Sequence, residues 1–227
     1  MTTQDGGNPL LQWGKGRFLL LLVSLLGLIV LVPLLEGYFA GIRFLLDIFV
    51  TAIFIAGIYA VSRNRFTGSI AIVLALPMFV STWITPFWNS PLLVLTGDLF
   101  GIIFLAFALL SILTYVLQEQ EVTADVIYGA IVVYLLMAIM WSFIYRVLET
   151  LHPDSFSFAQ NAVGEKRTLF TYYSFVTITT LGYGDITPTT GVAKAFSVLE
   201  AVIGQIYLVV LVARLVGINI SQSMKEK

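Results

Sequence analysis

The sequence predicts an all-α integral membrane protein that crosses the bilayer six times. Of its 227 residues 59% are apolar and 11% are charged, and the mean hydropathy is +0.95. Soluble domains carry about 25% charged residues, so one water-soluble core cannot hide this much apolar surface. Six windows of roughly 20 mainly apolar residues match the length that spans a hydrocarbon core. The alternating pattern of a barrel is missing and isolated strands would leave backbone groups unpaired in lipid, so the spans are helices.

Four of the apolar windows precede a polar linker and two follow it. They run over Phe18–Leu35, Ile42–Val61, Ile70–Trp88, Leu99–Leu117, Val126–Tyr145 and about Ala195–Ala213. The first window could be mistaken for a secretory signal, because two basic residues precede it. Its uncharged run is longer than the usual apolar core of a signal, and no small-x-small cleavage site follows it, so we interpret it as a span.

The polar linker from Gln118 to Asp125 is the sharpest change in composition along the chain. It predicts an N-terminal four-helix domain over 1–117, a cytoplasmic linker over 118–125 and a C-terminal domain over 126–227. With a cytoplasmic N-terminus, seven of the twelve basic residues lie inside, four of them beside the first helix or between the second and third. The positive-inside rule then places both termini in the cytoplasm of a multi-pass protein of the cell membrane.

Composition excludes several classes of function. The net charge of −1 gives no reason to expect a nucleic acid partner. No cysteine is present, which excludes disulfides, thiol catalysis and cysteine-ligated metals. The single histidine, His152, lies in a polar extracellular segment, where an exposed bystander is a better interpretation than a proton sensor. A membrane enzyme would need a nucleophile and a base at suitable spacing, and we expect neither an enzyme nor a cofactor.

The segment between the last two spans carries the most informative pattern. Thr168–Thr180 has neither glycine nor proline and is long enough for a helix that enters the membrane, but too short to cross it. Leu181–Asp185 then holds two glycines one residue apart. Irregular backbone at membrane depth survives only when it is buried in protein or lines a watery cavity. If residues 180–183 run extended with their carbonyls to one side, several copies around an axis would stack rings of oxygen that replace the water shell of a cation.

The run Thr177–Asp185 reads TITTLGYGD and resembles the selectivity-filter signature of potassium channels. The resemblance extends over roughly Val126–Ile220, in the order outer helix, re-entrant pore helix, filter and inner helix. It implies ion-binding residues that share one backbone segment, with K⁺ held by the first four: Thr180, Leu181, Gly182, Tyr183 and Gly184. Leu181 stands where the family more often has valine, and we expect its larger side chain to pack behind the filter.

The same resemblance implies residues that support the filter. Tyr172 and Tyr173 stand at positions often taken by tryptophans that brace it. A hydrogen bond from the Tyr172 hydroxyl to Asp185 would hold the outer mouth. The alternative is that both tyrosines only pack against neighbouring helices.

Three residues of the last helix are candidates for gating or for lining the cavity. Glu200 faces a watery cavity or, as we favour, bonds hydroxyls on the back of the pore helix, such as that of Thr177. Gly204 is either a hinge or a site of close helix packing. Gln205 is a plausible cavity-lining residue, and Arg214 is expected to reach the cytoplasmic surface.

The first four helices do not form a conventional voltage sensor. Steep voltage gating needs three or four basic residues in the fourth helix. The sequence has no basic residue between Arg65 and Arg146. Arg43 and Asp47, four residues apart, predict a local ion pair near the outer boundary.

The sequence therefore predicts a potassium-selective channel subunit that works as a homotetramer in membrane lipid, since one chain provides one filter segment and the ring needs four. Conduction is passive, with K⁺ as the permeant ligand. A weakly selective monovalent cation channel is the first alternative. A pore-loop cation transporter is the second, although such proteins need four filter-like loops per chain and this chain has one.

Overall fold

The computed structural model describes residues 16–35, 42–62, 64–88, 90–159 and 165–225. Most of these residues are helical, and two short strands flank the region that resembles a filter. The helices are α2 (Arg17–Leu35), α3 (Ile42–Val61), α4 (Arg65–Ile84), α5 (Pro91–Gln118), α6 (Ala124–Leu151), α7 (Lys166–Ile178) and α8 (Gly191–Lys225). The strands are β1 (Phe156–Phe158) and β2 (Ile186–Pro188).

Local capping chemistry sets where the helices begin and end. The Asn64 side chain accepts from the Thr67 amide at 2.8 Å and starts α4. The Thr123 side chain accepts from the Val126 amide at 3.3 Å and starts α6. α4 ends at Ile84, earlier than the predicted window; the Thr85 amide still donates to the Ser81 carbonyl, and Pro86 has no amide to continue the helix. α5, α6 and α8 run past their predicted windows, because apolar windows mark the hydrocarbon core and not the whole helix.

Among the described residues, five helices are long and apolar enough to cross a membrane: α3, α4, α5, α6 and α8. The chain is thus a helical membrane protein, as predicted. In α2 the described apolar run, Phe18–Leu31, is shorter than the length such a span requires. The first predicted span, Phe18–Leu35, and with it the total of six spans, therefore stays a prediction.

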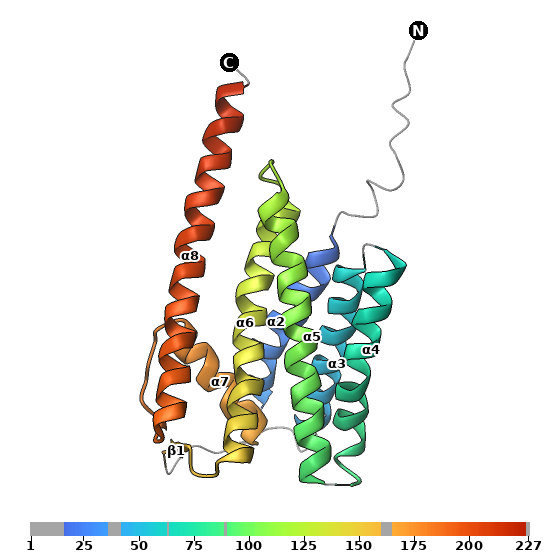
Figure 1. Cartoon of the computed structure of the whole chain (residues 1–227), viewed down its shortest axis with the longest axis vertical. Coiled ribbons are helices and arrows are strands. Elements are labelled where there is room, and N and C mark those ends of the chain that lie inside the picture. Colours follow the sequence, from blue (N-terminus) through green and yellow to red (C-terminus); the bar gives the residue numbers. More distant parts are fainter. Residues whose placement is uncertain (1–15, 36–41, 63, 89, 160–164, 226–227) are drawn as a thin grey trace.

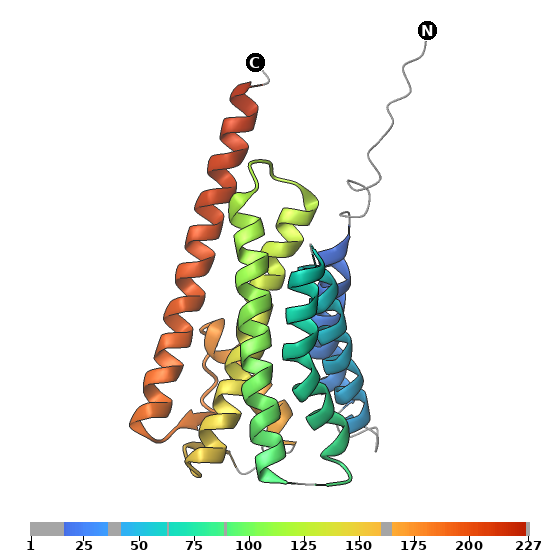
Figure 2. The ribbon, with the colours of Figure 1, turned by 45° about the vertical axis from the view of Figure 1, so that its right-hand side comes forward.

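The helices α2 to α6 stand side by side, and the long helix α8 runs along one edge of them (Figures 1 and 2). The short helix α7 lies between α6 and α8 and ends well within the height of the bundle (Figure 1). The α5–α6 linker lies at the same end as the C-terminal end of α8, whereas β1 and the end of α6 lie at the opposite end (Figure 1). α7 therefore starts at the β1 end and stops partway along the bundle.

Burial differs sharply between the two helices beside α7. In the most apolar window of α6 61% of the residues are buried, against 6% in that of α8. α7 is held to α6 by an aromatic cluster of Tyr145, Phe156, Phe170 and Tyr173, whose ring centroids lie 5.0 to 5.4 Å apart. This cluster fixes the position from which the filter-like segment starts.

Candidate functional site

The backbone angle φ alternates between positive and negative values from residue to residue directly after α7. Thr180, Gly182 and Gly184 have φ of 59°, 56° and 78°, whereas Leu181 and Tyr183 between them have negative φ. In a strand, successive carbonyls point to opposite sides, and alternating hands bring them to the same side. Two of the three left-handed positions are glycine, the residue for which this conformation has no steric cost. The segment is therefore built to align its carbonyl groups.

The first three amide groups of the same segment donate to carbonyls at the end of α7. The amide of Thr180 donates to the Thr177 carbonyl at 2.9 Å. Those of Leu181 and Gly182 donate to the Val176 carbonyl at 2.9 and 3.3 Å. These bonds also satisfy carbonyls in the last turn of α7, which lack partners within the helix. The amide side of the segment is thus fixed by its own chain.

The other side of the segment is bare. Leu181, which was expected to pack behind the segment, is 54% exposed in this chain. Tyr183 is 66% exposed, and a Cβ added at Gly182 or Gly184 would meet nothing within 4 Å. Within the part of the chain that the structure describes, no hydrogen bond reaches the carbonyl oxygens of residues 180–184. Apolar side chains and free carbonyls together make a surface that one chain leaves uncovered.

The end of α7 is held tightly from behind. The Ile178 carbonyl accepts from the Tyr134 hydroxyl at 3.1 Å and from the Gln205 amide at 3.5 Å. A Cβ added at Gly204 would lie 2.5 Å from Ile178 Cγ1 and 3.0 Å from the Ile178 carbonyl oxygen. Gly204 is therefore a site of close packing, one of its two predicted roles. Gln205, predicted to line the cavity, contacts the end of the pore helix.

Glu200 is completely buried between three helices. Its carboxyl group accepts from the Tyr145 hydroxyl of α6 and, at 2.5 Å, from the Ser174 hydroxyl of α7. The Ser174 hydroxyl also lies 2.6 Å from the Ala138 carbonyl. The prediction that Glu200 bonds the back of the pore helix is thus confirmed, but the choice of Thr177 is wrong. The partner is one turn earlier on α7, next to Tyr173, which bonds Ser197 of α8.

The predicted contact at the outer end of the filter is present. The Tyr172 hydroxyl donates to the Asp185 carboxylate at 2.7 Å. Burial, together with this hydrogen bond and the charge of Asp185, raises the pKa of Tyr172 to about 12. The hydroxyl therefore remains a donor throughout the physiological pH range. Tyr173 instead shares a hydrogen bond of 2.6 Å with Ser197 and so ties α7 to α8.

A two-stranded sheet that sequence reasoning missed braces the segment after the filter. β1 pairs antiparallel with β2, and the Ala159 amide donates to the Asp185 carbonyl at 2.9 Å. Glu149, at the end of α6, accepts from the Ser155 amide at 3.1 Å. Strands of three residues are too short to show a hydrophobic period, so the sequence pattern did not predict them. His152 is exposed at the end of α6, as predicted.

The structure gives partners to Asp47 and Arg214, and the predicted pair of Asp47 with Arg43 stays a prediction. Asp47 accepts from Arg167 at 2.6 Å, and the side chain of its sequence neighbour Arg43 lies outside the described residues. Arg214 donates to the Leu117 carbonyl and, at 3.0 Å, to the Glu119 carbonyl. Arg214 thus holds the α5–α6 linker to α8.

Comparison with known proteins places this geometry in a family. Neither the curated proteins nor the solved structures gave a match. A family model described as an ion channel matches residues 103–220, which is more than half of the 227 residues. The match runs from within α5 through α6, α7 and the alternating segment into α8. This family is of a type found in potassium channels, as the signature predicted. The chain therefore belongs to this family of ion channels.

Proposed function

We propose that the protein is the subunit of a potassium-selective channel that conducts K⁺ passively. The observation that carries the proposal is the alternation of φ at residues 180–184 at the end of a short re-entrant helix. Alternating hands bring successive carbonyls to one side, and the carbonyls of residues 180–184 accept no hydrogen bond from the described residues. No group is transferred and no catalytic residue or cofactor is needed.

Selectivity follows from how these carbonyls replace water. Copies of the segment around one axis stack rings of oxygen from Thr180, Leu181, Gly182 and Tyr183. The Thr180 hydroxyl adds a ring at the end nearest α7, and Gly184 closes the outer end. α7 points its C-terminus, which carries about half a negative charge, toward the same region. A dehydrated cation is thereby stabilised before and inside the rings.

A homotetramer in membrane lipid is the assembly that this function needs. One chain supplies one filter segment, and carbonyl-ring filters of this kind are built from four. The low burial of α8 and the exposure of Leu181 and Tyr183 support it, since neighbouring copies would cover these surfaces. If the subunit stayed alone, the apolar side chains of Leu181 and Tyr183 would be left without a protein neighbour to cover them.

The chain is organised in two parts across the membrane. We place the N-terminal helices in 1–117, the cytoplasmic linker in 118–125 and the pore module in 126–227, with six spans and both termini in the cytoplasm. α7 then enters from the extracellular side. The Thr180 end of the filter faces the cytoplasm, and Asp185 lies at the outer mouth.

The direct test is the reversal potential of purified protein in planar bilayers with K⁺ on one side and Na⁺ on the other. We expect a potential close to the K⁺ equilibrium value. A potential near zero would replace strict selectivity with the weakly selective channel. A current carried by anions, or protein that inserts and carries no current, would reject the proposal.

A further inference from the structure

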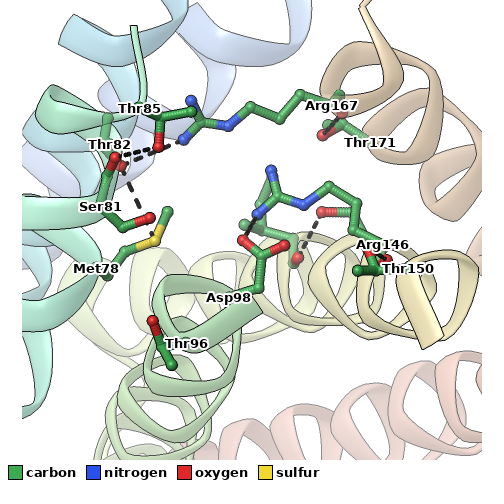
Figure 3. A network of polar contacts seen from close by, with 12 residues as sticks. Met78, Ser81, Thr82, Thr85, Thr96, Asp98, Arg146, Thr150, Arg167 and Thr171 are labelled. Atoms are coloured by element: carbon green, nitrogen blue, oxygen red, sulfur yellow. Dashed lines mark hydrogen bonds and ion pairs between the residues drawn. The ribbon is translucent and has the colours of Figure 1, made fainter. Parts of the chain in front are cut away.

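A buried polar network joins the N-terminal helices to the pore module. Asp47 of α3 and Asp98 of α5 are each 3% exposed. Each accepts from an arginine of the C-terminal part: Asp47 from Arg167 of α7, Nη1 to Oδ1 2.6 Å, and Asp98 from Arg146 of α6. Figure 3 shows Arg167 reaching across to α4 while Arg146 turns to Asp98. The network therefore bridges elements that lie 48 and 120 residues apart in the sequence.

These pairs are strong constraints because of where they lie. A carboxylate buried in an apolar helix is costly unless a cation satisfies it. Loss of one partner leaves the other charge buried without compensation, which costs far more than loss of an exposed pair. Asp47 therefore holds Arg167 close to α3. A shift of Asp47 would move the Arg167 side chain with it.

The position of Arg167 on α7 is not favoured by the helix itself. Arg167 is the second residue of α7, and a cation near a helix N-terminus opposes the helix dipole. Its contacts with the N-terminal helices explain the position, because Nη1 donates to Asp47 and Nη2 lies 3.5 Å from the Thr82 hydroxyl. Arg167 is thus placed to serve the interface.

Within the described residues, the hydrogen bonds that join the start of α7 to the N-terminal helices are those of Arg167. A cavity of about 470 Å³ separates them and is lined by Thr82, Thr85, Asp98, Arg146 and Arg167 among others. α7 packs its backbone mainly on α6 and α8. The Arg167 side chain therefore crosses an open space and acts as a tether.

We propose that Arg167 is a positioning residue through which the N-terminal helices set how often the filter conducts. The inference rests on the function proposed above. α7 is a continuous helix of 13 residues that begins at Lys166 and runs directly into the filter-like segment. A displacement of α3 pulls on Arg167, and the rigid helix carries this displacement to residues 180–184. The N-terminal helices thereby act on the filter without the basic residues of a voltage sensor.

The experiment is a double-mutant cycle on the full-length protein in lipid bilayers, with single-channel open probability as the readout. Asp47→Asn removes one charge and keeps the side-chain size, and Arg167→Gln removes one charge and leaves a shorter polar side chain. Each should change the open probability by about fivefold or more, as expected for coupled sites. The double variant should resemble either single variant instead of showing the product of their effects. Arg167→Lys, which keeps the charge but loses the planar fork, should lie between the wild type and Arg167→Gln.

Lys166→Gln is the matched control. Lys166 lies in the same turn of α7 and pairs with Glu149 of α6 at 3.4 Å, but its side chain is 70% exposed and its partner belongs to the pore module. The control should change the open probability by less than about twofold, because exposed pairs contribute little. If only the number of assembled channels changes among the Arg167 and Asp47 variants, the pair is structural and the proposal is overturned.

The charge-swapped protein, Asp47→Arg with Arg167→Asp, keeps the test sharp if a single variant fails to assemble. An open probability near the wild-type value supports the proposal, since the link is restored with reversed polarity. Assembled swapped channels with an open probability altered about fivefold would contradict it, as would single effects that multiply. A wild type without K⁺ current would instead refute the proposed function, and the inference would fall with it.

Discussion

α6 and α8 flank the same filter-like segment, yet one is covered and the other is bare. In their most apolar windows 61% of α6 and 6% of α8 is buried. α6 supplies Tyr134 and Tyr145, whose hydroxyls hold the end of α7 and Glu200. α8 contributes Glu200 and Gly204 on the face toward α7, and only 6% of its most apolar window is buried. The chain thus holds residues 180–184 and the end of α7 from the side of α6, whereas most of α8 is exposed.

The backbone of residues 180–184 shows a similar contrast between groups that are hydrogen-bonded and groups that are not. Its amides donate to the last turn of α7, whereas its carbonyls have no partner among the described residues. A ligand for those carbonyls must come from outside the chain, and unpaired carbonyls suit a cation. Substitutions on the two sides should therefore fail in different ways.

The largest effect is expected at Gly182. Gly182→Ala places a Cβ on a residue with φ of 56°, which costs about 1–2 kcal/mol in each copy and turns its carbonyl. K⁺ current should vanish while assembly remains, as measured by flux from liposomes and by size-exclusion chromatography. Gly191→Ala is the control, because its Cβ also meets nothing within 4 Å and its φ is ordinary. Equal currents in the two variants would break the comparison.

The next effect tests the covered side at Glu200. Glu200→Ala leaves the buried hydroxyls of Tyr145 and Ser174 without their carboxyl partner, at a cost of about 1–3 kcal/mol for each group. The assembled protein should unfold at a clearly lower temperature in detergent. Glu200→Gln, which keeps an amide between the same hydroxyls, should recover most of the loss. Glu200→Ala as stable as the wild type would show that this network does not hold the filter from behind.

A smaller loss is expected where α8 touches α7. Gly204→Ala puts a methyl group 3.0 Å from the Ile178 carbonyl oxygen, and overpacking of this kind costs typically about 1–3 kcal/mol. The same unfolding assay measures it, with Gly217→Ala as the control, since nothing lies within 4 Å there. Stability unchanged at Gly204 would favour the hinge over close packing.

The smallest effect is expected at the outer mouth. Tyr172→Phe removes one hydrogen bond to Asp185, which contributes about 1 kcal/mol. We expect K⁺ selectivity to persist while currents decay faster during sustained opening. Decay at the wild-type rate would show that the mouth is held by β1 and β2 alone.

Sequence reasoning reached the filter because its signal is contiguous. TITTLGYGD gives both the chemistry and the place where α7 ends, and the hydropathy windows locate the helices around it. The Tyr172 contact, which the resemblance to potassium channels implied, is also present.

Contacts between distant elements could not be predicted in the same way. Asp47 accepts from Arg167, which is 120 residues further along the chain. Local spacing carries no information about which helix packs opposite. The same limit explains why Ser174 was missed as the partner of Glu200: the phase of α7 against α8 depends on tertiary packing.

Crystallography of the assembled protein grown with Rb⁺, recorded at the rubidium absorption edge, tests the central claim most directly. We predict anomalous peaks in a row on a fourfold axis, each bounded by carbonyl oxygens of Thr180, Leu181, Gly182 or Tyr183 from every subunit. Peaks absent from that axis, or carbonyls of these residues directed away from a shared pathway, would contradict the account.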